Sequence, residues 1–241
     1  TETASRLRGR MEKIIGWATV RGHRKGANPA IWKSNLEMLL PMPSRSQTVK
    51  HHPALPWQDL PDFVEALRAR TGPSALALEF LILTAARSGE VREAPWSEID
   101  WNNRLWIVPV DRMKMKKEHR VPLSERALDI LKRRQEFCQK RPKSSDFIFF
   151  TKDPTIALSN AVFRQLFARM KYTDITAHGF RSTFRDWAGD TTEYPRELAE
   201  LALAHNVGDE VERAYRRNAA VERRRKLMDD WAAFCGQKNS I

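Results

Sequence analysis

Six side chains in this 241-residue sequence have the types needed to bind a phosphate and to attack it. They are Arg87 in TAARSGEVRE, Lys114 in RMKMKKEHR, His178 and Arg181 in AHGFR, His205 in LALAHN and Tyr215 in RAYRR. Arginine binds phosphate oxygens through a planar fork of N–H donors, a task that lysine does less well. A phenol flanked by cations, as Tyr215 is here, is suited to bind a phosphate and to lose its proton.

Each of these residues also has a purely structural interpretation. Arg87 follows a buried apolar stretch and lies three residues before Glu90, so the two are expected to form an ion pair. A hairpin lysine such as Lys114 more often serves solubility, and Tyr215 shares a helical stripe with Val211 and would then only be packed. Each residue alone is therefore weak evidence for a catalytic role, and only the combination of all six can support one.

The stretch ITAHGFRSTFRDWAGD, residues 175–190, predicts a helix with two different faces. The apolar face holds Phe180, Phe184 and Trp187, and the opposite face holds His178, Arg181 and Arg185. His178 and Arg181 stand at positions i and i+3, so they reach toward one point. The alternative is an amphipathic helix whose polar face is merely solvated.

The net charge indicates the kind of partner. The chain has 42 Lys and Arg against 30 Asp and Glu, which gives a formal charge of +12 and favours a polyanion, with nucleic acid the leading candidate. The apolar stretch at 74–87 is too short, and too interrupted by Glu79, to cross a bilayer, and the sequence lacks a signal-peptide pattern. We therefore expect a cytoplasmic protein with no membrane partner.

Cysteines and carboxylates give no sign of a metal site. Cys138 and Cys235 lack metal-ligand spacing and lie in amphipathic helical patterns, so we expect both to be reduced packing residues. No carboxylate cluster resembles a two-metal site. The sequence thus predicts neither a metal nor any other cofactor.

Apolar periodicity predicts a mostly helical chain with one small antiparallel sheet, an α+β fold. We expect helices at 5–20, around Trp32 to Leu39, over LPDFVEALRAR, at 74–87 in the core with Ser74 as its cap, and at 125–140. Strands are expected at 104–110 and 119–124, joined as a hairpin with a lysine-rich tip, and at 146–150. The final segment, 221–235, gathers Val221, Met228, Trp231, Ala232 and Cys235 into a stripe that needs a partner surface.

Prolines divide the chain. Four prolines between Pro41 and Pro56 interrupt any periodic pattern, so we expect a linker at 41–56 between residues 1–40 and a domain at 57–241. The two helices expected in residues 1–40 each have an apolar stripe, and two helices alone cannot bury both stripes. We therefore expect residues 1–40 to be the end of a helical domain that begins outside this chain.

The order Arg, Lys, His-x-x-Arg, His and Tyr resembles the tyrosine recombinases, specifically phage-type integrases of prophages and genomic islands. ARSGEV matches the motif of the first arginine, Arg87, and the family's lysine stands eight residues before the proline of a VPLS-like strand, which selects Lys114. HGFR resembles the His-x-x-Arg box, LAH supplies His205, and the tyrosine of AYRR matches the nucleophile. Five spaced elements over about 130 residues make the joint match specific.

The resemblance implies a catalytic domain at 57–241, preceded by the end of a core-DNA-binding domain, that cleaves and rejoins DNA to integrate or excise a mobile element. Tyr215 would form a 3′-phosphotyrosine, Arg87 and Arg181 would bind the non-bridging oxygens, and Lys114 would protonate the leaving 5′-oxygen. His178 would assist proton transfer, and His205 would donate a hydrogen bond to the phosphate. Glu90 is expected to brace the arginines or a histidine rather than to act as a base.

The expected partners are double-stranded attachment-site DNA, further copies of the chain in a synaptic tetramer, and an accessory DNA-bending protein. The residues expected to contact DNA are Arg112, Lys116, Lys117, Arg185, Arg213, Arg216 and Arg217. The closing helix at 221–235 either docks on its own domain or is exchanged between protomers.

Two other functions remain open from the sequence. A DNA-binding protein of the same fold without recombination explains the charge but leaves the six residues coincidental. A type IB topoisomerase-like enzyme keeps the covalent chemistry, and cleavage at many sites rather than one would identify it.

Overall fold

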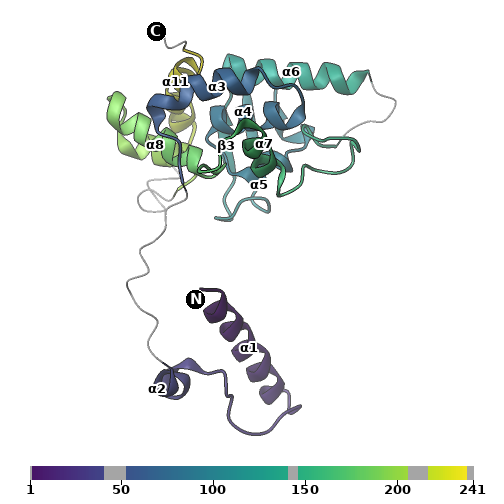
Figure 1. The fold of residues 1–241 in the computed structure, drawn as a ribbon, viewed down its shortest axis with the longest axis vertical. Helices are drawn as coiled ribbons and strands as arrows, with labels where there is room; N and C mark the ends of the chain where they lie inside the picture. Colours follow the sequence, from purple (N-terminus) through teal and green to yellow (C-terminus); the bar gives the residue numbers. More distant parts are fainter. Residues whose placement is uncertain (1, 41–52, 141–145, 206–216, 238–241) are drawn as a thin grey trace. The chain divides into compact units, whose positions relative to one another are not determined.

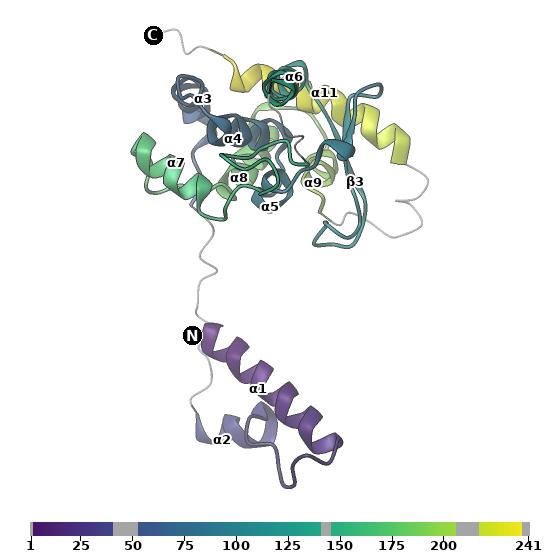
Figure 2. The ribbon, with the colours of Figure 1, turned by 90° about the vertical axis from the view of Figure 1, so that its right-hand side faces the viewer.

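The computed structural model describes residues 2–40, 53–140, 146–205 and 217–237, without the side chains of 217–220. The chain divides into two compact units, Thr1–His51 and His52–Ile241, a division that falls within the expected linker at 41–56. The first unit contains α1 (Glu2–Val20), an irregular turn η1 (Trp32–Leu36) and the short α2 (Glu37–Leu39), which Figure 2 shows most clearly. The expected helix from Trp32 to Leu39 is thus mostly a turn, because Lys33 and Ser34 have non-helical backbone angles.

In the first unit, the return segment after α1 folds back on the helix. Arg8 donates to the carbonyl of Ala30 at 2.7 Å, and Asn28 donates to the carbonyl of Glu12 at 2.8 Å. The apolar stripe of α1 remains exposed, since Leu7 and Ile14 are 57% and 66% accessible. The described part of this unit therefore leaves the predicted stripe without a core of its own.

The second unit is mostly helical with one small antiparallel sheet, as predicted (Figure 1). Its helices and turns are η2 (Trp57–Asp59), α3 (Leu60–Arg68), α4 (Pro73–Thr84), α5 (Ser88–Arg92), η3 (Trp96–Glu98), α6 (Glu125–Gln139), α7 (Val162–Met170), α8 (Gly179–Thr191), α9 (Arg196–Ala202) and α11 (Arg217–Cys235). Its strands are β1 (Ile99–Asp100), β2 (Leu105–Val108) and β3 (His119–Pro122), in the order β1-β2-β3.

Helix α4 forms the centre of the core. It is apolar on nearly all sides, Leu78, Phe80 and Leu81 are fully buried, and its one carboxylate, Glu79, is paired with arginines. The helix begins at Pro73 after Gly72, so the expectation that Ser74 caps it is wrong; proline is favoured in the first helical turn because it needs no N–H partner there. Within the described ranges, no helix combines the length and the hydrophobicity needed to cross a membrane.

The sheet differs from the prediction in one strand. β2 and β3 pair as the expected hairpin, with Val108 opposite His119 at the end next to the loop. The predicted strand at 146–150 is wrong: this buried segment makes only an isolated bridge between Phe147 and Pro95. The bridge does not extend because the Ala94 amide, which would pair next, donates to the Val91 carbonyl at 3.3 Å, and the Ile148 carbonyl accepts from Arg134 Nε at 3.0 Å. The third strand is β1 instead, which the sequence analysis missed.

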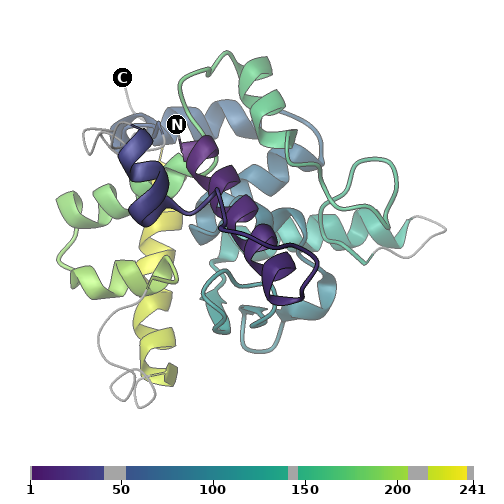
Figure 3. The same ribbon diagram turned by 90° about the horizontal axis from the view of Figure 1, so that it is seen from below.

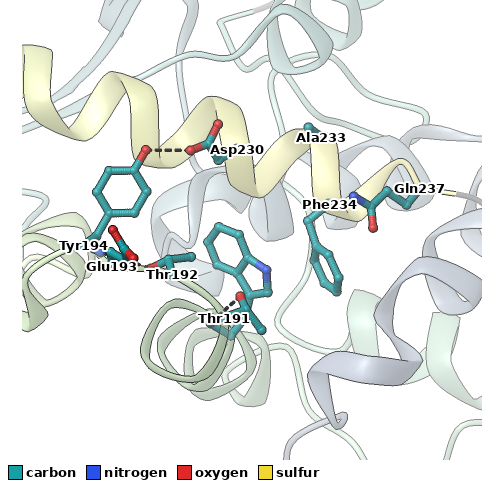
Figure 4. A pocket seen from close by; sticks show the side chains of 9 residues that line it. Thr191, Thr192, Glu193, Tyr194, Asp230, Ala233, Phe234 and Gln237 are labelled. Carbon is teal, nitrogen blue, oxygen red and sulfur yellow. Dashed lines mark hydrogen bonds between the residues drawn. The ribbon is translucent and has the colours of Figure 1, made fainter.

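Helix α11 lies against α3, α4, α9 and β3 of its own unit, and Figure 3 shows it in yellow beside the light green helices. Trp231 is fully buried and donates from Nε1 to the carbonyl of Ile82 at 2.8 Å. The Tyr194 hydroxyl donates to Asp230 at 2.5 Å across the pocket drawn in Figure 4. The predicted stripe has therefore found its partner surface, and both cysteines, Cys138 and Cys235, are thiols.

Helix α8 is held by an unusually close approach of the chain at Gly179. A Cβ atom there would overlap the carbonyl oxygen of Pro53 and lie 2.8 Å from the Cα of Ala54. The Thr176 amide also donates to the Pro53 carbonyl at 3.1 Å, so both a hydrogen bond and the close packing of Gly179 hold this carbonyl in place. The glycine of HGFR is thus required by packing against the segment that enters the unit.

We expect Gly179→Ala to lower the free energy of unfolding by about 1–3 kcal/mol, because backbone atoms must move to admit the methyl group. Gly189→Ala on the same helix is the matched control, since nothing lies within 4 Å of its Cβ position. That control should be neutral or slightly stabilising. Urea unfolding curves measure both, and equal stability of the two variants would contradict the packing argument.

Candidate active site

Arg87 lies between two helices rather than at the end of the buried one. Helix α4 ends at Thr84, Ala85 adopts a left-handed φ of 49°, and Arg87 precedes α5. The expected pair with Glu90 is confirmed: Arg87 Nη1 lies 2.9 Å from Glu90 Oε1, and the Arg87 backbone amide donates to Oε2 at 3.0 Å. The buried Glu90 therefore holds both the backbone and the guanidinium of Arg87.

Arg181 is buried, although the helical wheel places it on the polar face of α8. Only 4% of the residue is accessible. Its Nη1 donates to the Ala85 carbonyl at 2.6 Å and its Nη2 to the Leu203 carbonyl at 2.5 Å. Burial and the nearby charge of Arg87 lower the pKa of Arg181 to about 10, so the guanidinium stays charged at neutral pH. Arg181 thus ties α8 to the α4–α5 junction and to the end of α9.

His205 follows the two cap residues after α9, Leu203 and Ala204, and is oriented by that cap. Ala204 has a left-handed φ of 51°, its amide donates to Leu201 at 3.1 Å, and the His205 amide donates to Glu200 at 2.9 Å. These two bonds form a Schellman motif. The Glu200 carboxylate lies 2.5 Å from His205 Nδ1, and His205 Nε2 lies 3.1 Å from Arg181 Nη2. Glu200 therefore turns Nε2 of the ring toward Arg181.

The hairpin loop carries Lys114, Lys116 and Lys117, all exposed. Arg112 differs from them, because its guanidinium donates to the Glu98 carboxylate and, at 2.6 Å, to the Glu90 carbonyl. Only 19% of the Arg112 side chain is accessible. Its described contacts are internal, which favours a link between the hairpin and α5 over the predicted DNA contact.

The other predicted residues are placed only in part. His178 is exposed and directly precedes α8, and Arg185 is exposed on the same helix, 3.6 Å from Asp186. Three predicted residues lie outside the described residues: Arg213, Tyr215 and Arg216. For Arg217 only the backbone is described. The structure thus brings together Arg87, Glu90, Arg181 and His205.

Two site residues were missed by the sequence analysis. Glu200 stands on the last turns of an amphipathic helix, five residues before His205, but that spacing alone does not predict a contact. His119 is partly buried on β3, and its Nε2 lies 3.2 Å from the Ala202 carbonyl. The signal for His119 was available: strand alternation puts it on the same face as the buried Val121, with Arg120 exposed on the other.

The charges around this point suit an anion. Burial, together with the positive charges of Arg224, Arg181 and Arg87, lowers the pKa of His119 to about 3, so this ring is neutral. Arg87 and Arg181 are close enough that one charge affects the other's pKa, with Glu90 and Glu200 acting in the opposite direction. An oxyanion placed against the two guanidinium groups would relieve their repulsion and accept several hydrogen bonds.

The depressed pKa of His119 predicts a loss of stability in acid. The folded chain has a pKa of about 3 there and the ordinary value is 6.5, so the unfolded chain binds more protons between these limits. The free energy of unfolding should fall as pH drops below 6.5, by up to about 1.4 kcal/mol per pH unit.

His119→Gln lacks this titration, so between pH 7 and pH 5 the unmodified chain should lose about 2 kcal/mol more stability than the variant. Urea unfolding at the two pH values measures the difference. Equal losses in the two proteins would contradict the assignment.

Comparisons with known proteins indicate the family of the chain. The model of the phage integrase family matches residues 55–221. The chain is 30% identical over 235 residues to prophage integrase IntA of Escherichia coli (strain K12), covering 96% of this chain and 54% of that protein. It is 29% identical over 252 residues to the integrase of Enterobacteria phage P4, covering 97% and 55%. The chain therefore spans about half the length of these relatives.

Solved structures show the same fold at low sequence identity. A lambda integrase tetramer bound to a Holliday junction superposes with a TM-score of 0.58 at 17% identity, covering 87% of this chain and 60% of that one. A lambda integrase dimer bound to a core site gives 0.54 at 18% identity, covering 90% and 71%. From the match to residues 55–221, this chain belongs to the phage integrase family.

Proposed function

We propose that this chain is part of a site-specific DNA recombinase, which cleaves and rejoins DNA strands through a 3′-phosphotyrosyl intermediate to integrate or excise a mobile element. The observation that carries the proposal is the cluster of Arg87, Arg181 and His205, in which a nearly inaccessible guanidinium faces a histidine at 3.1 Å. A buried arginine beside a second, partly buried one is costly in itself and is suited to neutralise a phosphate in the transition state.

In this mechanism the Tyr215 oxygen attacks the phosphorus atom and the bond to the 5′-oxygen breaks. Arg87 and Arg181 bind the two non-bridging oxygens, whose charge grows as the attack proceeds. Lys114 delivers a proton to the departing 5′-oxygen, and His178 assists proton transfer near the tyrosine. The phosphotyrosyl ester keeps the energy of the broken bond, so rejoining to another 5′-hydroxyl needs no ATP.

The acidic residues of the cluster act through the basic ones. Glu90 fixes Arg87 with both carboxylate oxygens, and Glu200 holds the ring of His205 from the side away from Arg181. A hydrogen bond from His205 to the phosphate would use Nε2, the nitrogen that faces Arg181, and requires a proton on it. These contacts support positioning roles for Glu90 and Glu200.

DNA binding would use the exposed basic residues. Lys116, Lys117 and Arg185 are accessible for phosphate contacts, and Arg213, Arg216 and Arg217 remain predictions from the sequence. Residues 57–241 would form the catalytic domain, and residues 1–40 would end a helical core-binding domain, for which the exposed stripe of α1 provides an unfilled face.

The assembly and the cellular setting belong to the same proposal. We infer a tetramer on paired attachment sites, assisted by a DNA-bending protein, in the cytoplasm of a bacterium or of a phage-infected cell. In the described structure α11 docks on its own unit, which favours cis packing of this helix over exchange between protomers in the free chain.

The nucleophile assignment predicts that Tyr215→Phe abolishes covalent attachment to DNA and leaves DNA binding nearly unchanged, because only the hydroxyl is lost. The probe is a nicked duplex that spans the junction between the mobile element and the chromosome. A protease-sensitive adduct on a denaturing gel, together with a mobility-shift assay, gives both readouts. An undiminished adduct in the variant would exclude Tyr215.

The phosphate-binding assignment predicts that Arg181→Ala slows single-turnover cleavage by about 10²-fold or more, since a buried donor to the transition state is removed. Arg185→Ala, one turn further along α8 and exposed, is the matched control. It should weaken DNA binding modestly without changing the cleavage rate at saturating protein. Circular dichroism confirms that both variants fold, and normal cleavage by a folded Arg181→Ala would contradict the role.

A further inference from the structure

The C-terminal end of α9 accepts hydrogen bonds from three different elements. The carbonyl of Leu201 lies 3.5 Å from Arg224 Nη1 on α11, that of Ala202 lies 3.2 Å from His119 Nε2 on β3, and that of Leu203 lies 2.5 Å from Arg181 Nη2 on α8. The last carbonyls of a helix have no partner within it and carry its negative dipole end. Three consecutive carbonyls thus hold α11, β3 and α8 together at one edge of the site.

His119 is the member of this set that reaches the hairpin. It pairs with Val108 at the end of the β2–β3 ladder, so the loop that carries Lys114 connects these two residues. The first half of the loop is also anchored: Met113 is 2% accessible, and Arg112 donates to the Glu90 carbonyl on α5 at 2.6 Å. Lys114 directly follows Met113 and therefore lies between two anchored points.

We propose that His119 is a positioning residue. It holds the start of β3, where the Lys114 loop ends, against the C-terminal end of α9, which Arg181 also contacts. This inference rests on the proposed function of Lys114 as the proton donor. The bond sets the hairpin relative to Arg181, so that one phosphate can meet both the guanidinium and the ammonium group.

The chemical state of His119 fits this role. Because its pKa is about 3, the ring is neutral at working pH, and its contact with a carbonyl requires that Nε2 carries the proton. A neutral donor adds no charge beside Arg181 and Arg224. His119 is therefore suited to a structural hydrogen bond and unsuited to proton transfer.

The test separates loss of the proton donor from loss of phosphate binding. His119→Asn is too short to bring its amide to the Ala202 carbonyl, whereas His119→Gln can place an N–H near the position of Nε2. The two variants are compared on the nicked junction duplex with either the natural 5′-oxygen or a 5′-bridging sulfur at the cleaved bond. A thiolate leaves without being protonated, so the sulfur substrate does not need Lys114.

On the oxygen substrate, His119→Asn should form the phosphotyrosyl adduct about 10²-fold more slowly than the unmodified chain, the scale of a lost general acid, and His119→Gln should recover most of the rate. On the sulfur substrate, His119→Asn and Lys114→Ala should both come within a few-fold of the unmodified chain. Arg181→Ala should stay slow on both, because it acts on the non-bridging oxygens.

Two cleavage results would overturn the inference without affecting the proposed function: an unchanged rate of His119→Asn on the oxygen substrate, or an equal defect on both substrates while Lys114→Ala is rescued. Failure of the unmodified chain to form any adduct on either substrate would overturn the proposed function and, with it, this inference. Hydrogen exchange gives a readout independent of DNA, since amides of the hairpin should exchange faster in His119→Asn than in His119→Gln. Equal exchange in the two variants would also overturn the inference.

Discussion

The buried charge of Arg181 is the constraint on which the second unit depends. A guanidinium that is 4% accessible would be strongly destabilising without partners, and here the partners come from outside its own helix: the Ala85 carbonyl, the Leu203 carbonyl and His205. The need for these partners explains how two helices end. Helix α4 has to end before Ala85 so that a carbonyl is released, and α9 has to end in a Schellman cap that exposes Leu203 and presents His205.

Much of the secondary structure was predictable because it depends on local patterns. The nearly all-apolar α4, the helix α6 and the β2–β3 hairpin appear close to their expected positions. The errors have non-local causes. Residues 146–150 have the composition of a strand, but the Ala94 amide and the Ile148 carbonyl, which a ladder would pair, bond to Val91 and Arg134 instead. Arg181 was placed on the polar face of its helix, and a helical wheel cannot show that the end of α9 contacts it there.

The same distinction applies to the site. The pair of Arg87 and Glu90 follows from a spacing of three residues and could be predicted, although the chain was expected to be still helical at Arg87. Glu200 could not be assigned, because its role comes from the cap of α9. Strand alternation could place His119 on the buried face of β3, but not its contact with the end of α9. For Arg112 a basic stretch suggested a DNA contact, and its ion pair with Glu98 favours an internal link instead. Charge counts give the sign of a surface but not which side chains reach it.

The elements around the site are all positioned against the last turn of α9. Arg181, His119 and Arg224 bind three consecutive carbonyls of that turn, so α8, the hairpin and α11 are each positioned against the same short piece of backbone. Consecutive backbone atoms have fixed separations, which limits how far the three donors can move relative to one another. The Schellman cap then places His205 within the same frame. A phosphate bound by Arg181 would therefore be located relative to the hairpin and α11 without any direct contact between those elements and the arginine.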